Sequence, residues 1–297
     1  IDYQVYEFGK RKLRGPRTSN PKYIAYLGAA QTFGRYCPNP FPNILGERLQ
    51  IGTLNLGKGG AGPTYFLNSP HSQTMLEAVD RAQLVVVQVM SGRSISNSVF
   101  QSLIGCNNGF RLPDGKQMKS LMIWNKLLKG KDKRGLEFQF LKDLIEETRQ
   151  NHVNATIELL KRISPPKILL WFSVRSPQQL QELSQYSLAM SRRLLGGGLS
   201  SRILHRMGIG NNTMDIHLGE FPHLIDRSMV DEIKKYSDSY VECVTRANMP
   251  QQLVNFQGDA IGQNIYYPSP EMHERAAEQL LPVCKRMLEI HQSPTRN

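Results

Sequence analysis

Five short apolar runs constrain the fold of this chain more than any other feature of its sequence. Each is rich in β-branched or aromatic residues and is bounded by turn residues, and together they cover 23–28, 49–57, 82–90, 167–174 and 239–245. Runs of this kind are typical of buried strands, and helix-sized stretches separate them. Strands that alternate with helices predict a parallel sheet with helices on both faces. We therefore expect an α/β fold, a three-layer αβα sandwich around a five-stranded, mainly parallel sheet, with loop insertions.

Two stretches carry clear helical spacing of apolar residues. The stretch 137–163 places leucine, isoleucine and valine at helical spacing and charged residues on its other faces, and Pro165 and Pro166 end it before the next strand. It is expected to be a crossover helix packed on the sheet. A final helix is expected to begin at Pro270, because proline is favoured in the first turn and Ser269 is a good N-cap residue.

The chain is expected to divide into a short basic segment and one large domain. Residues 1–21 are expected to form a solvated basic N-terminal arm. Its positive charges include Lys10, Arg11, Lys12, Arg14 and Arg17. Nucleic-acid binding by this arm is the less favoured alternative, because no aromatic residues are interleaved with the charges to stack on bases. Residues 22–291 are expected to form a single α/β domain with insertions at about 104–135 and 176–222, after strand ends where active-site loops commonly grow.

The charge of the chain indicates the kind of partner it binds, and its cysteine content indicates the cellular compartment. The 297 residues include 37 Lys and Arg against 25 Asp and Glu, and the net charge of +12 favours an anionic small molecule or glycan as the partner. The four cysteines form no CxxC pair, so neither a zinc site nor a disulfide framework is expected, and a cytoplasmic location is the default. No apolar window reaches the roughly 18 residues of a membrane span. The sequence does not indicate an oligomeric state.

The loops that follow the apolar runs are polar and rich in glycine. They read GAAQTFGR at 28–35, NLGKGGAGP at 55–63, SGRSISNS at 91–98 and SVRSP at 173–177, and the last helix opens with YYPSPEMH at 266–273. Ligands of open α/β sheets bind beyond the carboxyl ends of the strands. A binding site is therefore expected where these loops meet.

The order and character of these loops resemble the conserved blocks of the SGNH/GDSL hydrolase superfamily over about residues 23–285. Its first block, Gly-Asp-Ser followed by Thr and Gly, is similar to 28–34, its glycine block to 55–60, and its last block, Asp-x-x-His, to 270–273. The resemblance implies a flavodoxin-like sandwich with an oxyanion site of backbone N–H groups. The chain also resembles a bacterial domain family, uncharacterised in activity, that carries the GAAQTFGR and PSPEMH motifs.

Two positions depart from the pattern of that superfamily. Ala30 stands where the serine nucleophile would be, and Pro270 stands where the triad aspartate would be. A methyl group cannot attack a carbonyl, so the usual acyl-serine route is closed at Ala30. His273 is the expected catalytic base, because the positive end of the helix dipole favours neutral imidazole, with a packing or capping role as the alternative. Glu271 is a candidate acidic partner, although it is not on the same helix face as His273, and Glu274 and Asp259 are no better supported. The candidate replacement nucleophiles are Ser91, Ser94, Ser96, Ser173 and Cys37, none of which stands in a Gly-x-Ser-x-Gly turn.

An anion-binding pocket is expected around these residues. Arg35, Lys58, Arg93 and Arg175 each follow a different predicted strand. A guanidinium can donate two hydrogen bonds to an oxyanion, which favours a role in anion binding. The alternative for each is ordinary surface charge. The expected substrate-binding residues are Ala30, Gln31, Thr32, Arg35, Lys58, Gly59, Gly60, Arg93, Ser94, Asn97 and Arg175. The histidines other than His273 have no metal-ligand spacing, so a structural or solvent role is expected for each of them and no metal site is expected.

Two functions from different classes fit these features. The first is an SGNH-like enzyme that transfers or hydrolyses an acyl or sulfuryl group of an anionic or carbohydrate substrate, with His273 as the base and without the standard serine. The sequence requires no cofactor, and an activated donor such as a nucleotide sulfate is compatible with group transfer. The second is a catalytically inactive domain that binds an anion or a carbohydrate in the same pocket.

Overall fold

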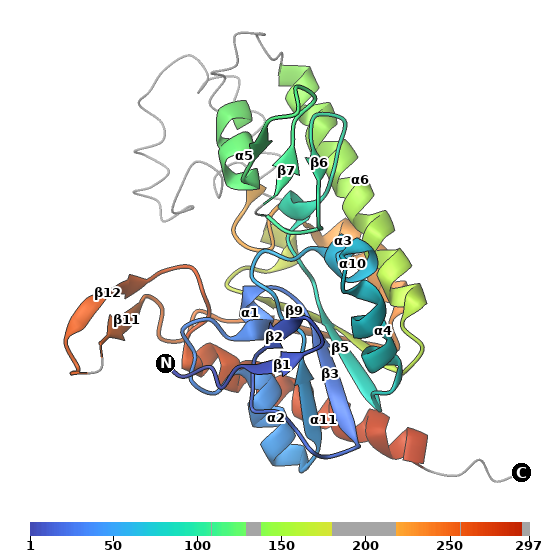
Figure 1. Ribbon diagram of the computed structural model, residues 1–297, viewed down its shortest axis with the longest axis vertical. Helices are drawn as coiled ribbons and strands as arrows, with labels where there is room; N and C mark the ends of the chain where they lie inside the picture. The colour runs from blue at the N-terminus through green and yellow to red at the C-terminus, as the bar shows by residue number, and fades with distance from the viewer. Residues whose placement is uncertain (108, 129–137, 180–217, 256, 293–297) are drawn as a thin grey trace, which may run out of the picture.

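A five-stranded parallel sheet forms the centre of the computed structural model, which describes residues 1–107, 109–128, 138–179, 218–255 and 257–292 (Figure 1). Its strands are β3 (Tyr23–Leu27), β4 (Gly52–Asn55), β5 (Leu84–Gln88), β9 (Lys167–Ser173) and β10 (Ser239–Val244), in the order β10-β9-β5-β3-β4. Every neighbouring pair is parallel. The predicted fold class is confirmed, and each strand lies inside one of the five apolar runs.

Helices cover both faces of this sheet and complete the three layers. One face carries α2 (Phe41–Leu49) and α11 (Pro270–Gln292); the other carries α3 (Pro63–Asn68), α4 (Ser72–Asp80), α6 (Phe138–Arg162) and α10 (Arg227–Ile233). Successive residues of a strand point to opposite faces of a sheet. Accordingly, Ile24 and Tyr26 of β3 are buried with α2 and α11, whereas Ala25 and Leu27 are buried with the helices of the other face.

The two helices expected from the sequence are present at the predicted positions. α6 ends before Pro165, and α11 begins at Pro270. Ser269 caps α11, because its Oγ accepts a hydrogen bond from the backbone N–H of Met272 at 3.2 Å. Among the helices of the described ranges, none has both the length and the apolar character that crossing a bilayer requires.

The N-terminal segment differs from the expectation of a solvated arm. Part of 1–21 forms a hairpin of β1 (Tyr6–Phe8) and β2 (Arg11–Leu13), and Leu13 belongs to the core on the α3 and α4 face. The Arg14 side chain is buried and donates hydrogen bonds to three backbone carbonyl groups of the loop 34–38. One of the charges expected in solvent therefore ties the segment to the domain.

The described residues of the predicted insertion at about 104–135 belong to a small unit at the top of Figure 1, and residues 108 and 129–135 of that insertion lie outside the described ranges. β6 (Gln101–Ser102), β7 (Phe110–Arg111) and β8 (Gln117–Met118) make an antiparallel sheet, and α5 (Ser120–Leu128) packs with it. Phe100, Phe110 and Trp124 are buried together at its centre with Leu144 of α6. Most of the other predicted insertion, 176–222, lies outside the described residues.

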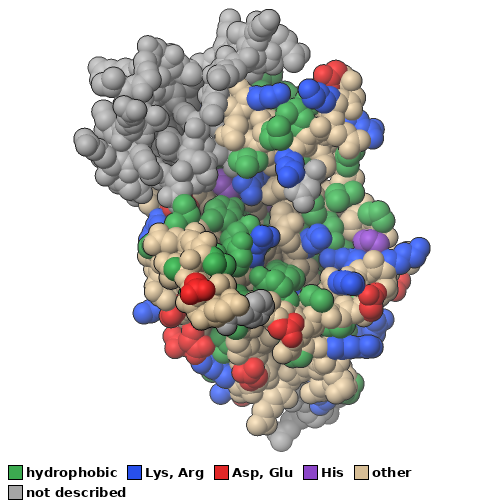
Figure 2. Space-filling model, turned by 60° about the vertical axis from the view of Figure 1, so that its left-hand side comes forward, with side chains coloured by type: hydrophobic (Ala, Val, Ile, Leu, Met, Phe, Trp, Pro, Cys, Tyr) green, Lys and Arg blue, Asp and Glu red, His purple; other side chains and the backbone are tan. Residues whose placement is uncertain are grey.

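A second hairpin, absent from the sequence-based expectations, projects from the body of the protein (Figure 1). β11 (Gln251–Val254) pairs with β12 (Ala260–Asn264) in antiparallel orientation. Figure 2 views this side of the molecule, where hydrophobic side chains gather next to the hairpin with Lys and Arg side chains around them. At its base, the buried Asn264 amide oxygen accepts hydrogen bonds from the backbone N–H groups of Tyr266 and Tyr267. The hairpin base therefore fixes the chain that precedes α11.

Replacing Arg14 by glutamine is expected to destabilise the protein by about 2–4 kcal/mol, because buried carbonyl groups of the loop 34–38 lose a charged donor. The matched control is Arg17→Gln, which removes an exposed guanidinium of the same segment and should change the free energy of unfolding by less than about 0.5 kcal/mol. Urea unfolding near neutral pH measures both variants. Equal stability of the two would contradict the packing of the N-terminal hairpin.

Candidate functional site

The candidate site lies beyond the carboxyl ends of the strands, between β3 and β5. The order of the strands reverses there, because β4 lies on one side of β3 and the later strands follow on the other. Such a reversal opens a crevice between loops that leave the sheet in opposite directions. The crevice receives the turn into α1 (Ala30–Phe33), the loop after β4, and the turn into η1 (Gly92–Ser94) after β5.

A pocket of about 290 Å³ occupies this crevice, and we call it the switch-point pocket. It combines residues of the first three predicted loops with the chain before α10 and the turn after β12. Its lining residues are Ala29, Ala30, Gln31, Gly60, Ala61, Ser91, Arg93, Asn107, Phe221, Tyr266 and Tyr267. Five of the residues expected from the sequence therefore lie around one pocket.

A buried amide fixes the turn at the floor of the pocket. Gln88, the last residue of β5, accepts hydrogen bonds at Oε1 from the Ala29 backbone N–H at 3.1 Å and from Thr32 Oγ1 at 2.7 Å. Position 28 must be glycine, because a Cβ there would lie 2.1 Å from Thr32 Oγ1. Thr32 therefore supports the turn from inside, and the expectation that it binds substrate is wrong.

Arg93 brings a positive charge to the pocket wall. The Asn107 amide oxygen accepts hydrogen bonds from Arg93 Nε and Nη2 at 3.0 Å each when the amide nitrogen faces Ser94 Oγ. We adopt this orientation because a guanidinium has only donors to offer. The Tyr266 hydroxyl lies 3.4 Å from Arg93 Nη2. Within the described part of the chain no carboxylate pairs with Arg93, so its charge is available to an anionic ligand.

The hydroxyl of Ser91, which lines the pocket, lies next to the imidazole of His223, which is buried behind it and does not line the pocket. Ser91 Oγ lies 3.1 Å from His223 Nδ1, and both side chains are buried. The Gly92 backbone N–H donates to the His223 carbonyl at 3.0 Å, and the Tyr266 ring stacks on the imidazole. A hydroxyl within hydrogen-bond reach of an imidazole is the arrangement of a nucleophile and its general base. The sequence predicts a structural or solvent role for His223, so it does not predict this pair.

Arg175 is a structural residue, and the expectation that it binds an anion is wrong. Its side chain is buried, stacks on Trp171 and donates hydrogen bonds to the backbone carbonyl groups of Glu220, Pro222 and Ile225. Burial lowers the pKa of this guanidinium to about 9. Because the carbonyl groups are in the loop that carries His223, Arg175 holds that loop against the end of β9.

His273 lies in the core and is not placed to act as a base, contrary to the expectation. Its Nδ1 accepts a hydrogen bond from the Phe41 backbone N–H at 3.2 Å, and its ring packs against Phe41 and Phe172. The side chain is fully buried and lines neither the switch-point pocket nor the cavity next to it. Burial, with a smaller effect of the Arg14 charge, lowers its pKa to about 3. His273 therefore has the alternative role given in the sequence-based prediction, which is packing at the start of a helix.

Three of the other expected residues lie outside the pocket but near its loops. Arg35 is exposed, and its guanidinium lies over the Tyr267 ring at 5.2 Å from the centroid, at the rim of the pocket. Lys58 and Gly59 are exposed on the loop after β4 and do not line the pocket. None of the three lines the pocket, so their positions do not meet the expectation of direct ligand contact.

Three further expected residues support the backbone. Ser94 is buried and its Oγ donates to the Gly60 carbonyl at 2.9 Å. The Asn97 side chain closes a turn, since its Oδ1 accepts from the backbone N–H of Phe100 at 3.1 Å. Glu271 is exposed at the start of α11 and accepts a hydrogen bond from Asn248. None of the three lines the switch-point pocket, so the roles expected for them in binding and catalysis are corrected.

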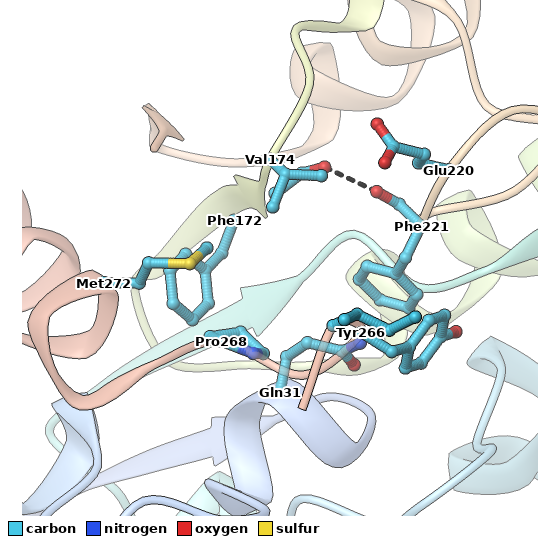
Figure 3. A pocket seen from close by; sticks show the side chains of 10 residues that line it. Gln31, Phe172, Val174, Glu220, Phe221, Tyr266, Pro268 and Met272 are labelled. Carbon is cyan, nitrogen blue, oxygen red and sulfur yellow. Dashed lines mark hydrogen bonds between the residues drawn. The ribbon is translucent and has the colours of Figure 1, made fainter. Parts of the chain in front are cut away.

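A second cavity, of about 420 Å³, adjoins the switch-point pocket, and we call it the apolar pocket (Figure 3). Gln31, Phe221 and Tyr266 line both cavities. The other lining residues of the apolar pocket are Phe172, Ser173, Val174, Glu220, Ile265, Pro268 and Met272. The two cavities are therefore neighbours with a common wall.

Comparison with known proteins gives a partial family match and several distant folds. The family model described as Domain of unknown function (DUF6473) matches residues 1–108. A search of curated proteins finds no match. Among solved structures, a candidate SGNH hydrolase from Slackia heliotrinireducens is 15% identical, covers 89% of this chain and 98% of its own, and has a TM-score of 0.39.

Two carbohydrate esterases are similarly distant. An acetyl xylan esterase from the rumen bacterium Butyrivibrio proteoclasticus is 10% identical over 94% of this chain and 66% of its own, with a TM-score of 0.42. A family two carbohydrate esterase from Clostridium thermocellum, in complex with cellohexaose, is 11% identical, covers 95% of this chain and 69% of its own, and has a TM-score of 0.41. At these values the likeness says nothing about the reaction of this chain.

Replacing His273 by asparagine is expected to reduce the acid sensitivity of the protein. The folded-state pKa of about 3 lies below the ordinary value of 6.5, so the unfolded chain binds the extra proton and stability falls as pH drops through this window. Asparagine keeps an acceptor for the Phe41 N–H without titrating. Between pH values of about 6.5 and 4.5, the wild type should lose about 2 kcal/mol more than the variant. Urea unfolding at both pH values measures this, and equal losses would contradict the burial of His273.

Proposed function

We propose that the protein is an ester hydrolase or group-transfer enzyme that acts in the switch-point pocket on a substrate with an anionic or carbohydrate portion. The observation that carries this proposal is the 3.1 Å distance between Ser91 Oγ and His223 Nδ1, because Ser91 lines that pocket and His223 lies directly behind it. The charge of Arg93, which lines the same pocket, supports an anionic substrate. Ser91 takes the place of the serine missing at Ala30, and His223 takes the place proposed from the sequence for His273.

The reaction follows the general chemistry of a serine nucleophile. His223 Nδ1 accepts the proton of Ser91 while Oγ forms a bond to the carbonyl carbon of the ester. The bond from that carbon to the leaving oxygen then breaks, and the proton passes from His223 to the leaving alcohol. Water attacks the acyl-serine with His223 again as base, which releases the acid and restores Ser91. If the hydroxyl of a second substrate replaces water, the outcome is transfer.

Arg93 supplies the electrostatic part of the proposal. Asn107 and Tyr266 orient its guanidinium, so little further ordering is needed when an anionic group binds. A planar guanidinium matches the paired oxygens of a carboxylate or sulfate. Hydrolysis of such a substrate requires no cofactor, whereas sulfuryl transfer would require an activated donor such as a nucleotide sulfate.

A binding domain without turnover is the second candidate, and one observation favours it. Ser91 Oγ also accepts a hydrogen bond from the Arg93 backbone N–H, at 3.4 Å, as the N-cap of η1. These two hydrogen bonds, to the Arg93 N–H and to His223, give the Ser91 hydroxyl a structural role that does not require catalysis. Under this reading the pocket would hold an anion or a carbohydrate beside Arg93 and release it unchanged.

Replacing Ser91 by alanine is expected to lower kcat by about a thousandfold or more, since the nucleophile is removed. The assay is hydrolysis of 4-nitrophenyl esters and of acetylated or sulfated oligosaccharides by the full chain. The matched control is Ser98→Ala, which removes an exposed serine of the same loop, and His273→Asn should also keep full turnover. Wild-type turnover in Ser91→Ala would exclude Ser91 as the nucleophile, and no turnover in the wild type would favour the binding domain.

Replacing Arg93 by glutamine is expected to weaken binding of inorganic sulfate about tenfold or more, because a charged, bidentate donor is lost. Arg35→Gln is the matched control, because Arg35 stands at the rim but does not line the pocket. Isothermal titration of the folded protein gives the dissociation constants without any need for turnover. If Arg35→Gln is the more damaging of the two, the anionic group binds at the rim and not beside Ser91.

A further inference from the structure

Gln31 presents a buried acceptor to the junction of the two cavities. Its side chain is 2% exposed, and its Oε1 has no hydrogen-bond partner among the described residues. Figure 3 shows the side chain reaching from α1 toward Tyr266, in the wall that both cavities share. A buried carbonyl oxygen without a donor is unfavourable, so this atom is suited to accept a hydrogen bond from a bound molecule.

The cavity beyond Gln31 suits an apolar group. Its apolar lining residues are Phe172, Val174, Phe221, Ile265, Pro268 and Met272. One carboxylate, that of Glu220, completes the lining, and the Arg246 guanidinium pairs with it at 2.5 Å. Burial of apolar ligand surface against such side chains is favourable, while a few polar groups set the orientation of the ligand.

The shared wall places the apolar pocket next to the reaction centre of the proposed function. Ser91 and Arg93 line the switch-point pocket, and Gln31 lines both that pocket and the apolar one. A molecule that fills both cavities therefore passes Gln31 where its two parts join. Such a molecule has an anionic or sugar part beside Arg93 and an apolar part beyond Gln31.

We propose that the apolar pocket is a second substrate subsite, which takes an apolar acyl or aryl group that bears an N–H or O–H donor for Gln31 Oε1. Its place in an ester substrate rests on the proposed function, whereas binding of the apolar group does not depend on turnover. Gln31 is thus assigned as an acceptor for a neutral donor, and not as a ligand of the anion.

Two neutral amides test the subsite. Hexanamide has an N–H donor and N,N-dimethylhexanamide has none, and both are titrated against the full chain by ligand-observed NMR. The wild type is expected to bind hexanamide about five- to tenfold more tightly, as one net hydrogen bond allows. Gln31→Met, which keeps the length of the side chain but removes the acceptor, should bind both amides equally. Its thermal stability should not fall, because the lost oxygen has no partner among the described residues.

Two control variants separate the subsite from general effects. Gln73→Met changes an exposed glutamine of α4 and should keep the wild-type preference for hexanamide. Ile265→Asn changes a lining residue that is 51% exposed, so the fold should tolerate it while both amides bind several-fold more weakly. A preference that survives in Gln31→Met would be steric and would overturn the proposal, as would a wild type that binds neither amide.

The same titration in Ser91→Ala distinguishes this proposal from the proposed function. If that variant keeps the preference for hexanamide while the wild type hydrolyses no ester, the subsite stands and the enzymatic function fails. If the wild type hydrolyses esters through Ser91 but shows no preference between the amides, the function stands and the subsite is overturned.

Discussion

The buried guanidinium of Arg175 is the contact on which the arrangement of the candidate site depends. A parallel sheet positions loops only at its own strand ends. The candidate site also includes Phe221, which lines the pocket, and His223, which lies 3.1 Å from Ser91, and both follow a long connection after β9. Arg175 holds this segment by donating to three carbonyl groups, which precede, separate and follow these two residues in the chain. Because a buried guanidinium requires such acceptors, the loop and the cation stabilise each other.

The sheet was predictable because its strands are buried on both faces, and such strands read as continuous apolar runs. The helices α6 and α11 were predictable for similar reasons, from apolar spacing and from the proline and serine residues at their ends. The β11–β12 hairpin was not predictable in this way. Four of the five residues of β12 are exposed, so its sequence has no apolar alternation. The packing of the N-terminal hairpin was not predicted, because its many basic residues indicate a solvated segment and do not show that Arg14 is buried.

The order of the strands predicts which loops meet at the site, but it does not predict which side chains of those loops line the pocket. Position after a strand correctly brings Ala30, Gly60 and Ser91 to one pocket, but it does not say where a long side chain ends. Arg93 and Arg175 both follow strands; backbone carbonyl groups surround the second, whereas the first keeps its charge for the pocket.

His273 was predicted as a site residue but lies in the core, whereas His223 was not predicted but lies next to Ser91. His273 stands at the expected helix start, but the core covers it, and no local spacing reveals that burial. His223 follows no predicted strand and lies more than a hundred residues from Ser91, a separation of 132 positions. A signal for this pair would have had to come from tertiary structure, because nothing in the neighbouring sequence links the two residues.

Arg175 holds the loop by its main chain, and this has a consequence for how the protein can vary. Every amino acid has a backbone carbonyl group, so Glu220, which lines the apolar pocket, can change identity without removing the acceptor that Arg175 binds. A substitution at this position would therefore change the side chain in the pocket wall without loss of the hydrogen bond that holds the loop. Homologous proteins could vary the pocket wall in this way while the scaffold behind it stays the same.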